Sequence, residues 1–175
     1  MTTASVSAES VLSELRRVAE IAAGILDGDE VKQIVNEQAM QYIANPDPKF
    51  VYLSGDYFDV DQQLFLRNKK LLLRLERLGK VTMNSALWVP VPGQDAVTLV
   101  LHNGAYHRYY TFGLERLPTP PEMKEVLEAG TIVSVPPSDD KNLATVLAPV
   151  RDSLGDVVGV VELTAPLDTP PPAWS

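Results

Sequence analysis

The chain has 175 residues, of which 45% are hydrophobic and 22% are charged, and its formal net charge is -8. These values are ordinary for one soluble globular domain with a sizeable core, but the acidic balance argues against a nucleic-acid-binding protein, because such a protein needs Lys and Arg to neutralise phosphates. The chain contains no cysteine, which excludes a disulfide framework, a thiol nucleophile and a thiolate metal site.

The first predicted element is an amphipathic helix over Ser7–Leu26. Its apolar residues recur every three or four positions, and Ser7 can cap its N-terminus. Two interpretations of this apolar stripe remain open. It packs on the rest of the domain, or it also pairs with the same stripe of a second copy. The residues expected in such a homodimer contact are Leu12, Leu15, Ala19 and Ala22.

A second helix is predicted over Glu30–Ala44. Asp29 can serve as its N-cap, and Gly28 can end the helix before it. The segment Asn45–Pro48 ends the second helix, because proline lacks the backbone donor that a helix interior needs.

A third helix is predicted from a cap at Asp59 or Asp61 to Leu78, with Gly79 as its end. Its basic side chains lie off the leucine stripe. We interpret them as a solvated face that pairs with Glu76 and neighbouring acids, rather than as an anion-binding patch. These basic residues are Arg67, Lys69, Lys70, Arg74 and Arg77.

After Lys80 the apolar pattern changes from the helical period to the two-residue period of strands. The last two strands form a hairpin around the turn Asp152–Asp156. A short helix over Glu122–Ala129, ended by Gly130, interrupts the strands. The predicted strands are Ser85–Val91, Ala96–His102, Thr131–Val135, Leu143–Arg151 and Val157–Thr164.

This order of elements predicts an α+β fold. We expect an antiparallel sheet of about five strands, with the N-terminal helices, the first of them long, on one face. The expected division of the chain is N-terminal helices over 1–45, a sheet-containing core over 46–166 and a proline-rich tail or linker over 167–175.

Three stretches resemble the Cache family, the PAS-like sensor domains of bacterial receptors, kinases and cyclases. They read AEIAAGILDGDEVKQIV, FLRNKKLLLRLERLGKVTMNSALWVPV and LATVLAPVRDSLGDVVGVVEL, and they are similar to the family's long first helix, its leucine-rich helix and its closing hairpin. The resemblance implies a PAS/Cache-like fold, a homodimer, a location outside the membrane and a ligand pocket between the sheet and its long loops. The family's amino-acid-binding pattern of Tyr, Arg, Trp, Tyr and Asp is not clearly matched, so the resemblance implies no particular ligand.

The richest polar group of residues follows the second predicted strand. Tyrosine rings and an arginine fork suit a small carboxylate ligand, because a guanidinium can hold a carboxylate through two parallel hydrogen bonds. We expect Arg108 to anchor this ligand, with aromatic walls and a hydrogen-bond partner in His102. The alternative is a surface loop whose tyrosines pack on the core and whose arginine pairs with a nearby acid. The expected ligand-binding residues are Trp88, His102, Tyr106, Arg108 and Tyr110.

The sequence has no phosphate-binding loop, no G-x-S-x-G elbow and no H-E-x-x-H motif. Its two histidines, His102 and His107, have no cysteine or nearby acid to complete a metal site. We therefore expect a non-catalytic domain that senses a small molecule in signal transduction, with no cofactor and no metal. Two alternatives stay open: a small α+β enzyme, a hydrolase or isomerase using His107 with an acid, and a GAF-like interaction domain with no ligand.

The chain has no run of eighteen apolar residues and no signal-peptide pattern. As written, it is expected in the cytoplasm, with a small-molecule ligand and a second copy as its partners and no nucleic acid. The alternative is an extracytoplasmic domain of a membrane receptor, which would have the same features. A membrane is an expected partner only in that second case.

Overall fold

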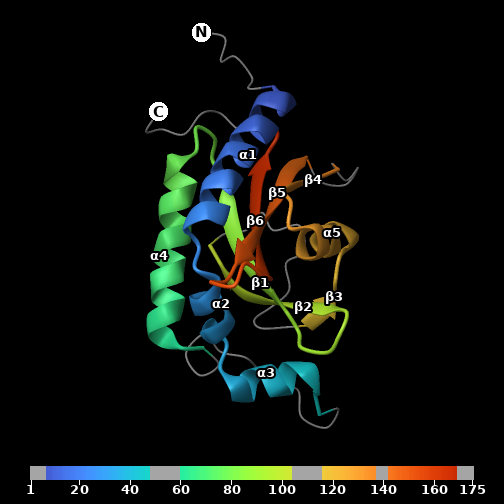
Figure 1. Ribbon diagram of the computed structural model, residues 1–175. Coiled ribbons are helices and arrows are strands. Elements are labelled where there is room, and N and C mark those ends of the chain that lie inside the picture. The colour runs from blue at the N-terminus through green and yellow to red at the C-terminus, as the bar shows by residue number, and fades with distance from the viewer. Residues whose placement is uncertain (1–6, 48–59, 104–115, 137–141, 169–175) are drawn as a thin grey trace.

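The computed structural model describes residues 7–47, 60–103, 116–136 and 142–168. Within these residues the chain forms five helices and six strands (Figure 1). The helices are α1 (Ala8–Ile25), α2 (Gly28–Ile34), α3 (Glu37–Ala44), α4 (Gln62–Leu78) and α5 (Pro121–Ala129). The strands are β1 (Asn84–Pro90), β2 (Ala96–His102), β3 (Arg116–Pro118), β4 (Val133–Val135), β5 (Leu143–Arg151) and β6 (Val157–Pro166).

The described strands form one antiparallel sheet with the order β3-β2-β1-β6-β5-β4. Its central pair, β1 and β6, comes from distant parts of the chain. Helices α1, α2 and α4 lie on one face, and α5 lies on the other (Figure 1). The α+β fold with N-terminal helices on one face is therefore confirmed. Strand β3, which ends the excursion after β2, is a sixth strand beyond the five predicted.

Alternation along the strands divides the core between the two faces of the sheet. On β6, Val161 packs with the larger cluster under α1, α2 and α4, whereas Val160 packs with the smaller cluster under α5. Met123 and Val126 of α5 are fully buried in this smaller cluster. Because successive side chains of a strand point to opposite faces, the almost continuous apolar run of β6 supplies both cores.

Helix α1 packs its apolar stripe on β5 and β6 of its own chain. Ser7 Oγ accepts a hydrogen bond from the backbone three residues on, as the predicted N-cap requires. Leu15, Ala19 and Ala22 are fully buried, and only Leu12 of the four proposed contact residues keeps partial exposure. Three of the four residues proposed for the homodimer contact are therefore used in the core of their own chain, which leaves Leu12 as the accessible one. A homodimer through the N-terminal helix stays a prediction.

The predicted helix Glu30–Ala44 is two helices, α2 and α3, separated at Val35 and Asn36. Asn36 Oδ1 accepts a hydrogen bond of 2.8 Å from a backbone N–H in the first turn of α3 and caps that helix. Val35 forms a β-bridge with Val60. The apolar spacing predicted one helix because neither a side-chain cap nor a long-range bridge alters a helical period.

Gly28 is the first residue of α2 and does not end α1. The N-cap of α2 is Asp27, whose Oδ1 accepts a hydrogen bond of 2.9 Å from the Asp29 backbone N–H, so the predicted cap at Asp29 is wrong by two positions. A Cβ at Gly28 would lie 2.4 Å from the carbonyl oxygen of Arg151. This glycine therefore allows α2 to begin directly against the end of β5.

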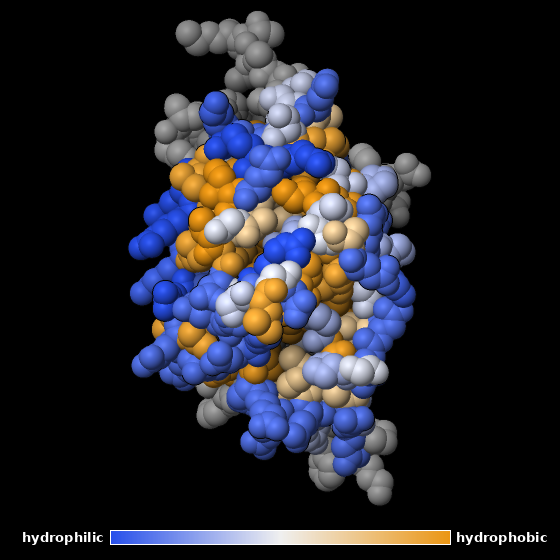
Figure 2. Space-filling model, in the orientation of Figure 1, coloured by the Kyte–Doolittle hydropathy of each residue, from blue (hydrophilic) through white to orange (hydrophobic). Residues whose placement is uncertain are grey.

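Helix α4 begins at its predicted cap Asp61 and ends at Gly79. Its basic residue Arg67 forms an ion pair of 2.7 Å with Glu30, whereas Glu76 Oε1 accepts hydrogen bonds from Ser85. Figure 2 shows apolar residues exposed between charged ones on this side of the molecule, and the exposed leucines of α4 are Leu66, Leu73 and Leu78. Singly exposed leucines of this kind are common on protein surfaces. No helix among the described residues is both long and apolar enough to cross a bilayer.

Candidate functional site

Two of the five predicted ligand-binding residues lie in the described part of the chain. Trp88 is on β1 and His102 is the last residue of β2, directly opposite Ala86. Since Ala86 and Trp88 are two positions apart and both pack under α5, Trp88 and His102 share the α5 face of the sheet. Tyr106, Arg108 and Tyr110 lie outside the described residues, as does His107. Their roles stay predictions.

Trp88 is fully buried, and its indole N–H is used inside the protein. Nε1 donates a hydrogen bond of 3.0 Å to Oε2 of Glu162 on β6. The hydroxyl of Thr164 donates to the other carboxyl oxygen of Glu162 at 3.3 Å. Thr145 on β5 lies opposite Thr164 and is also buried. We name these four residues, Trp88, Thr145, Glu162 and Thr164, the Glu162 cluster.

A buried acid in a strand is the feature that sequence reasoning missed. Burial of a carboxyl group in an apolar core is unfavourable unless hydrogen bonds satisfy it. Glu162 is nevertheless 0% exposed, and it lies two positions from Val160 on the face that α5 covers. The signal was present in the run VVGVVELTAP, where a single acid occupies an inward-facing position of an apolar strand.

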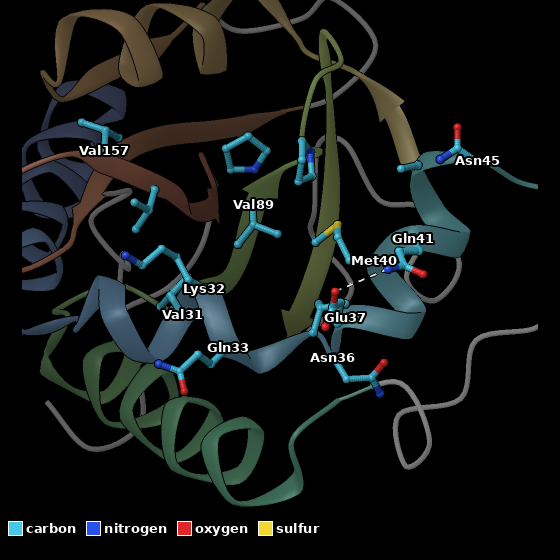
Figure 3. Close-up of a pocket in the computed structure, with 15 residues that line it drawn as sticks. Val31, Lys32, Gln33, Asn36, Glu37, Met40, Gln41, Asn45, Val89 and Val157 are labelled. Carbon is cyan, nitrogen blue, oxygen red and sulfur yellow. Dashed lines mark hydrogen bonds between the residues drawn. The ribbon is translucent and has the colours of Figure 1, made fainter.

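The described residues also line a groove on the other side of the sheet, between β1, β6 and the α2–α3 segment (Figure 3). Its volume is about 930 Å³, which is within the usual range for a small-molecule site. Figure 3 shows Val89 and Met40 directed into this space, whereas Gln33, Asn36 and Asn45 point away from it. The remaining apolar lining residues are Val31, Val35, Ala44, Pro90, Pro92, Val157 and Val158.

The groove lies where the two central strands separate. Pairing between β1 and β6 ends at Trp88–Val160. Beyond this point β1 continues paired with β2 as far as Pro90, and β6 continues paired with β5 as far as Val157. Proline has no backbone N–H to donate to a neighbouring strand, so Pro90 suits the end of this pairing.

Lys32, at one edge of the groove, is held by two carboxylates. Its Nζ lies 2.9 Å from Oδ2 of Asp152 and 3.1 Å from Oδ1 of Asp29. The hydrogen bond from Lys32 lowers the pKa of the Asp152 carboxyl, and the bond to Asp152, followed by that to Asp29, raises the pKa of Lys32. Hydrogen bonding with Ser153, followed by that with Lys32, lowers the pKa of Asp29. These contacts join the β5–β6 turn to α2.

Replacing Lys32 by methionine should therefore destabilise the protein most between about pH 4 and about pH 10. The two aspartates have lowered folded pKa values, so their contribution is lost as the pH falls through those values. Lys32 has a raised folded pKa, so its contribution is lost as the pH rises through that value. Chemical denaturation across this range measures the difference from the native protein. Lys70→Met on α4 is the control, and a Lys32→Met effect as small and pH-independent as the control's would contradict this account.

Among the described residues, no three His, Asp or Glu side chains lie close enough to hold a metal ion. The described residues show instead a buried hydrogen-bonded cluster around Glu162 on the α5 face and a mainly apolar groove on the helical face. In the first, both carboxyl oxygens of Glu162 accept hydrogen bonds from neighbouring side chains. The second offers apolar surface.

No protein-family model and no curated protein matches the chain. Among solved structures, it is similar to one described as the structure of the GAF domain, with 12% identity over 84% of this chain and 79% of that chain and a TM-score of 0.44. The GAF domain of nlh2 from A. aeolicus in an inactive state has 15% identity over 78% of this chain and 79% of that chain, with a TM-score of 0.40. The ligand-binding domain of the Campylobacter jejuni chemoreceptor Tlp3, in complex with 4-methylisoleucine, has 14% identity over 94% of this chain and 62% of that chain, with a TM-score of 0.37. These likenesses are too distant to transfer a ligand or a residue role to this chain.

Proposed function

We propose that this chain is a non-catalytic ligand-binding domain of the Cache or GAF kind, which senses a small carboxylate-bearing molecule. The ligand site lies on the α5 face of the sheet, beside His102 and the segment 104–115 that follows it. Arg108 binds the ligand carboxylate, and Tyr106 and Tyr110 enclose the rest of the molecule. Trp88 completes the wall from the side of the sheet.

The observation that carries this proposal is the Glu162 cluster. A buried carboxyl group rarely adds stability beyond what a well-packed apolar residue would give, and α5 already supplies apolar partners on this face. Glu162 is nevertheless kept at the centre of the sheet, with Trp88 and Thr164 as hydrogen-bond donors. Perturbed or buried ionisable groups concentrate at functional sites, which supports a binding role for this face.

The position of Glu162 also constrains the orientation of the ligand. The oxygens of Glu162 already accept hydrogen bonds from Trp88 and Thr164, and a carboxylate offers only further acceptors, so the ligand carboxylate lies toward Arg108 and away from Glu162. A hydrogen-bond donor elsewhere on the ligand, an amine or a hydroxyl, then suits the floor of the site. The proposed ligand class is therefore a small carboxylate that also carries such a donor.

Thermal unfolding with matched probes tests this proposal. Glycine and lactate carry a carboxylate and a donor, whereas glycinamide and lactamide lack only the carboxylate. At about one hundred times Kd a native-state ligand adds roughly 2.7 kcal/mol of stability, which corresponds to a rise in Tm of about 5–10 °C for a chain of this size. We expect such a rise with at least one carboxylate and none with its amide. Equal shifts with both members of each pair, or no shift at the solubility limit of all four, would contradict the proposal.

A further inference from the structure

We propose that the groove between the separated ends of β1 and β6 is a second ligand site, which takes an uncharged and mainly apolar small molecule. It lies on the helical face of the sheet, bounded by the α2–α3 segment (Figure 3). The proposed carboxylate site lies on the α5 face, so the two sites are on opposite faces of the sheet.

The groove is a built feature of the fold. The pairing of β1 with β6 stops at Trp88. Pro90, two residues further along β1, has no N–H to donate to β6. Helix α2 lies against the strands at the same point. At the same point a Cβ on Gly159 would lie 3.0 Å from the Trp88 carbonyl oxygen and 3.3 Å from Cγ1 of Val31. Val31 of α2 therefore packs over the glycine where the two strands begin to separate.

The surface that faces the groove is apolar and only partly covered by the chain itself. Met40, Pro90, Val157 and Val158 are half-buried, whereas Val89 beneath them is almost fully buried. Half-buried apolar side chains that converge on one space lose further contact with water when a ligand fills it. The interruption between α2 and α3 at Asn36 and the end of β1 at Pro90 therefore leave an apolar site with room for a molecule.

The charged groups at the groove disfavour an anionic ligand. Lys32 is held by Asp29 and Asp152. Glu37 lies in the first turn of α3, where the helix dipole favours an acid, and its Oε1 accepts a hydrogen bond from Gln41 Nε2. An anionic ligand would have to leave water beside the Glu37 carboxylate and without an unpaired cation from Lys32, and that desolvation is unfavourable. An uncharged ligand avoids this cost.

The test uses Nile red, an uncharged dye whose fluorescence rises in apolar surroundings, and anilinonaphthalene sulfonate as its anionic counterpart. Titration of the full chain should give saturable Nile red binding and at least tenfold weaker binding of the sulfonate. Met40→Glu, which places a charge in the groove, and Val158→Trp, which fills it, should each weaken Nile red binding at least tenfold. Circular dichroism and Tm confirm that both variants fold.

Leu154→Glu is the matched control, because Leu154 is 83% exposed on the β5–β6 turn and does not line the groove. Nile red affinity should be unchanged in this variant and in Arg108→Ala, which separates the groove from the carboxylate site. Three outcomes would overturn the proposal: equal binding of both dyes, an equal loss in Leu154→Glu, or unchanged binding in both groove variants. Loss of dye binding with rising protein concentration, together with faster sedimentation, would assign the groove to a second copy of the chain and also overturn it.

Discussion

Replacing Trp88 by alanine is expected to lower the free energy of unfolding by about 3–5 kcal/mol. The indole is 0% exposed and is the largest fully buried side chain among the described residues. Its removal leaves a cavity in the smaller core under α5, where Met123 and Val126 pack. It also removes the donor that bonds to Oε2 of Glu162, so a buried carboxyl group loses a partner as well. Chemical denaturation monitored by circular dichroism measures this change.

Trp88→Phe separates the two contributions. Phenylalanine keeps most of the apolar volume but has no N–H, so the expected loss is about 1–3 kcal/mol, the cost of leaving a buried acceptor without its partner. Trp174→Phe is a control for the removal of an indole elsewhere in the chain. If Trp88→Ala and Trp174→Phe had the same small effect, Trp88 would not be a core residue and the fold described here would be wrong.

Replacing Arg108 by alanine is expected to weaken carboxylate binding by about 2 kcal/mol or more, which is a loss of roughly thirtyfold in Kd. The reason is that a guanidinium holds a carboxylate through two parallel charge-assisted hydrogen bonds. Arg108→Lys should lose most of the same affinity, because an ammonium group is a point charge without the planar fork. Isothermal titration with the carboxylate that raises Tm measures both variants.

Unchanged Tm in the absence of ligand is the control for Arg108, since a binding residue can be removed without loss of the core. If Arg108→Ala bound the carboxylate with the same affinity as the native protein, Arg108 would not be the anchor. The carboxylate would then be bound by another cation, and the Glu162 cluster would remain the only support for a site on this face.

Local chemistry made much of the fold predictable from the sequence. The caps at Ser7 and Asp61, and the glycines after α4 and α5, mark helix ends through the side chains and backbone conformations that those ends require. The apolar, β-branched run Leu143–Arg151 identified a strand of the sheet, and its hairpin partner followed from the turn.

The features that were missed depend on contacts between distant residues. The break between α2 and α3 uses a bridge from Val35 to Val60, and Gly28 is required by the approach of Arg151. The groove exists because β1 and β6, which are separated by most of the C-terminal half of the chain, stop pairing at Trp88. The apolar periodicity of one strand does not show at which residue its pairing with a distant strand ends.

The candidate site shows the same division. Trp88 and His102 lie on the same face of the sheet, as strand alternation and register require, whereas their role in ligand binding stays a prediction. The sequence did not reveal Glu162, since the pairing of Trp88 with that acid needs β6 to lie beside β1. It left open whether the apolar stripe of α1 packs on its own domain or also on a second copy, and β5 and β6 of the same chain cover most of that stripe.

The most direct test of the central claim is the indole N–H signal of Trp88 in a proton–nitrogen correlation spectrum during titration with the carboxylate ligand. The chain has two tryptophans, so Trp174→Phe assigns this signal unambiguously. Because Trp88 Nε1 bonds to Glu162 at the floor of the proposed site, we predict that its signal shifts progressively and saturates with the same Kd as the calorimetry. A Trp88 signal that stays fixed while the ligand saturates, with shifts instead at Val31, Met40 and Val158, would place the ligand in the groove and contradict a binding site on the α5 face.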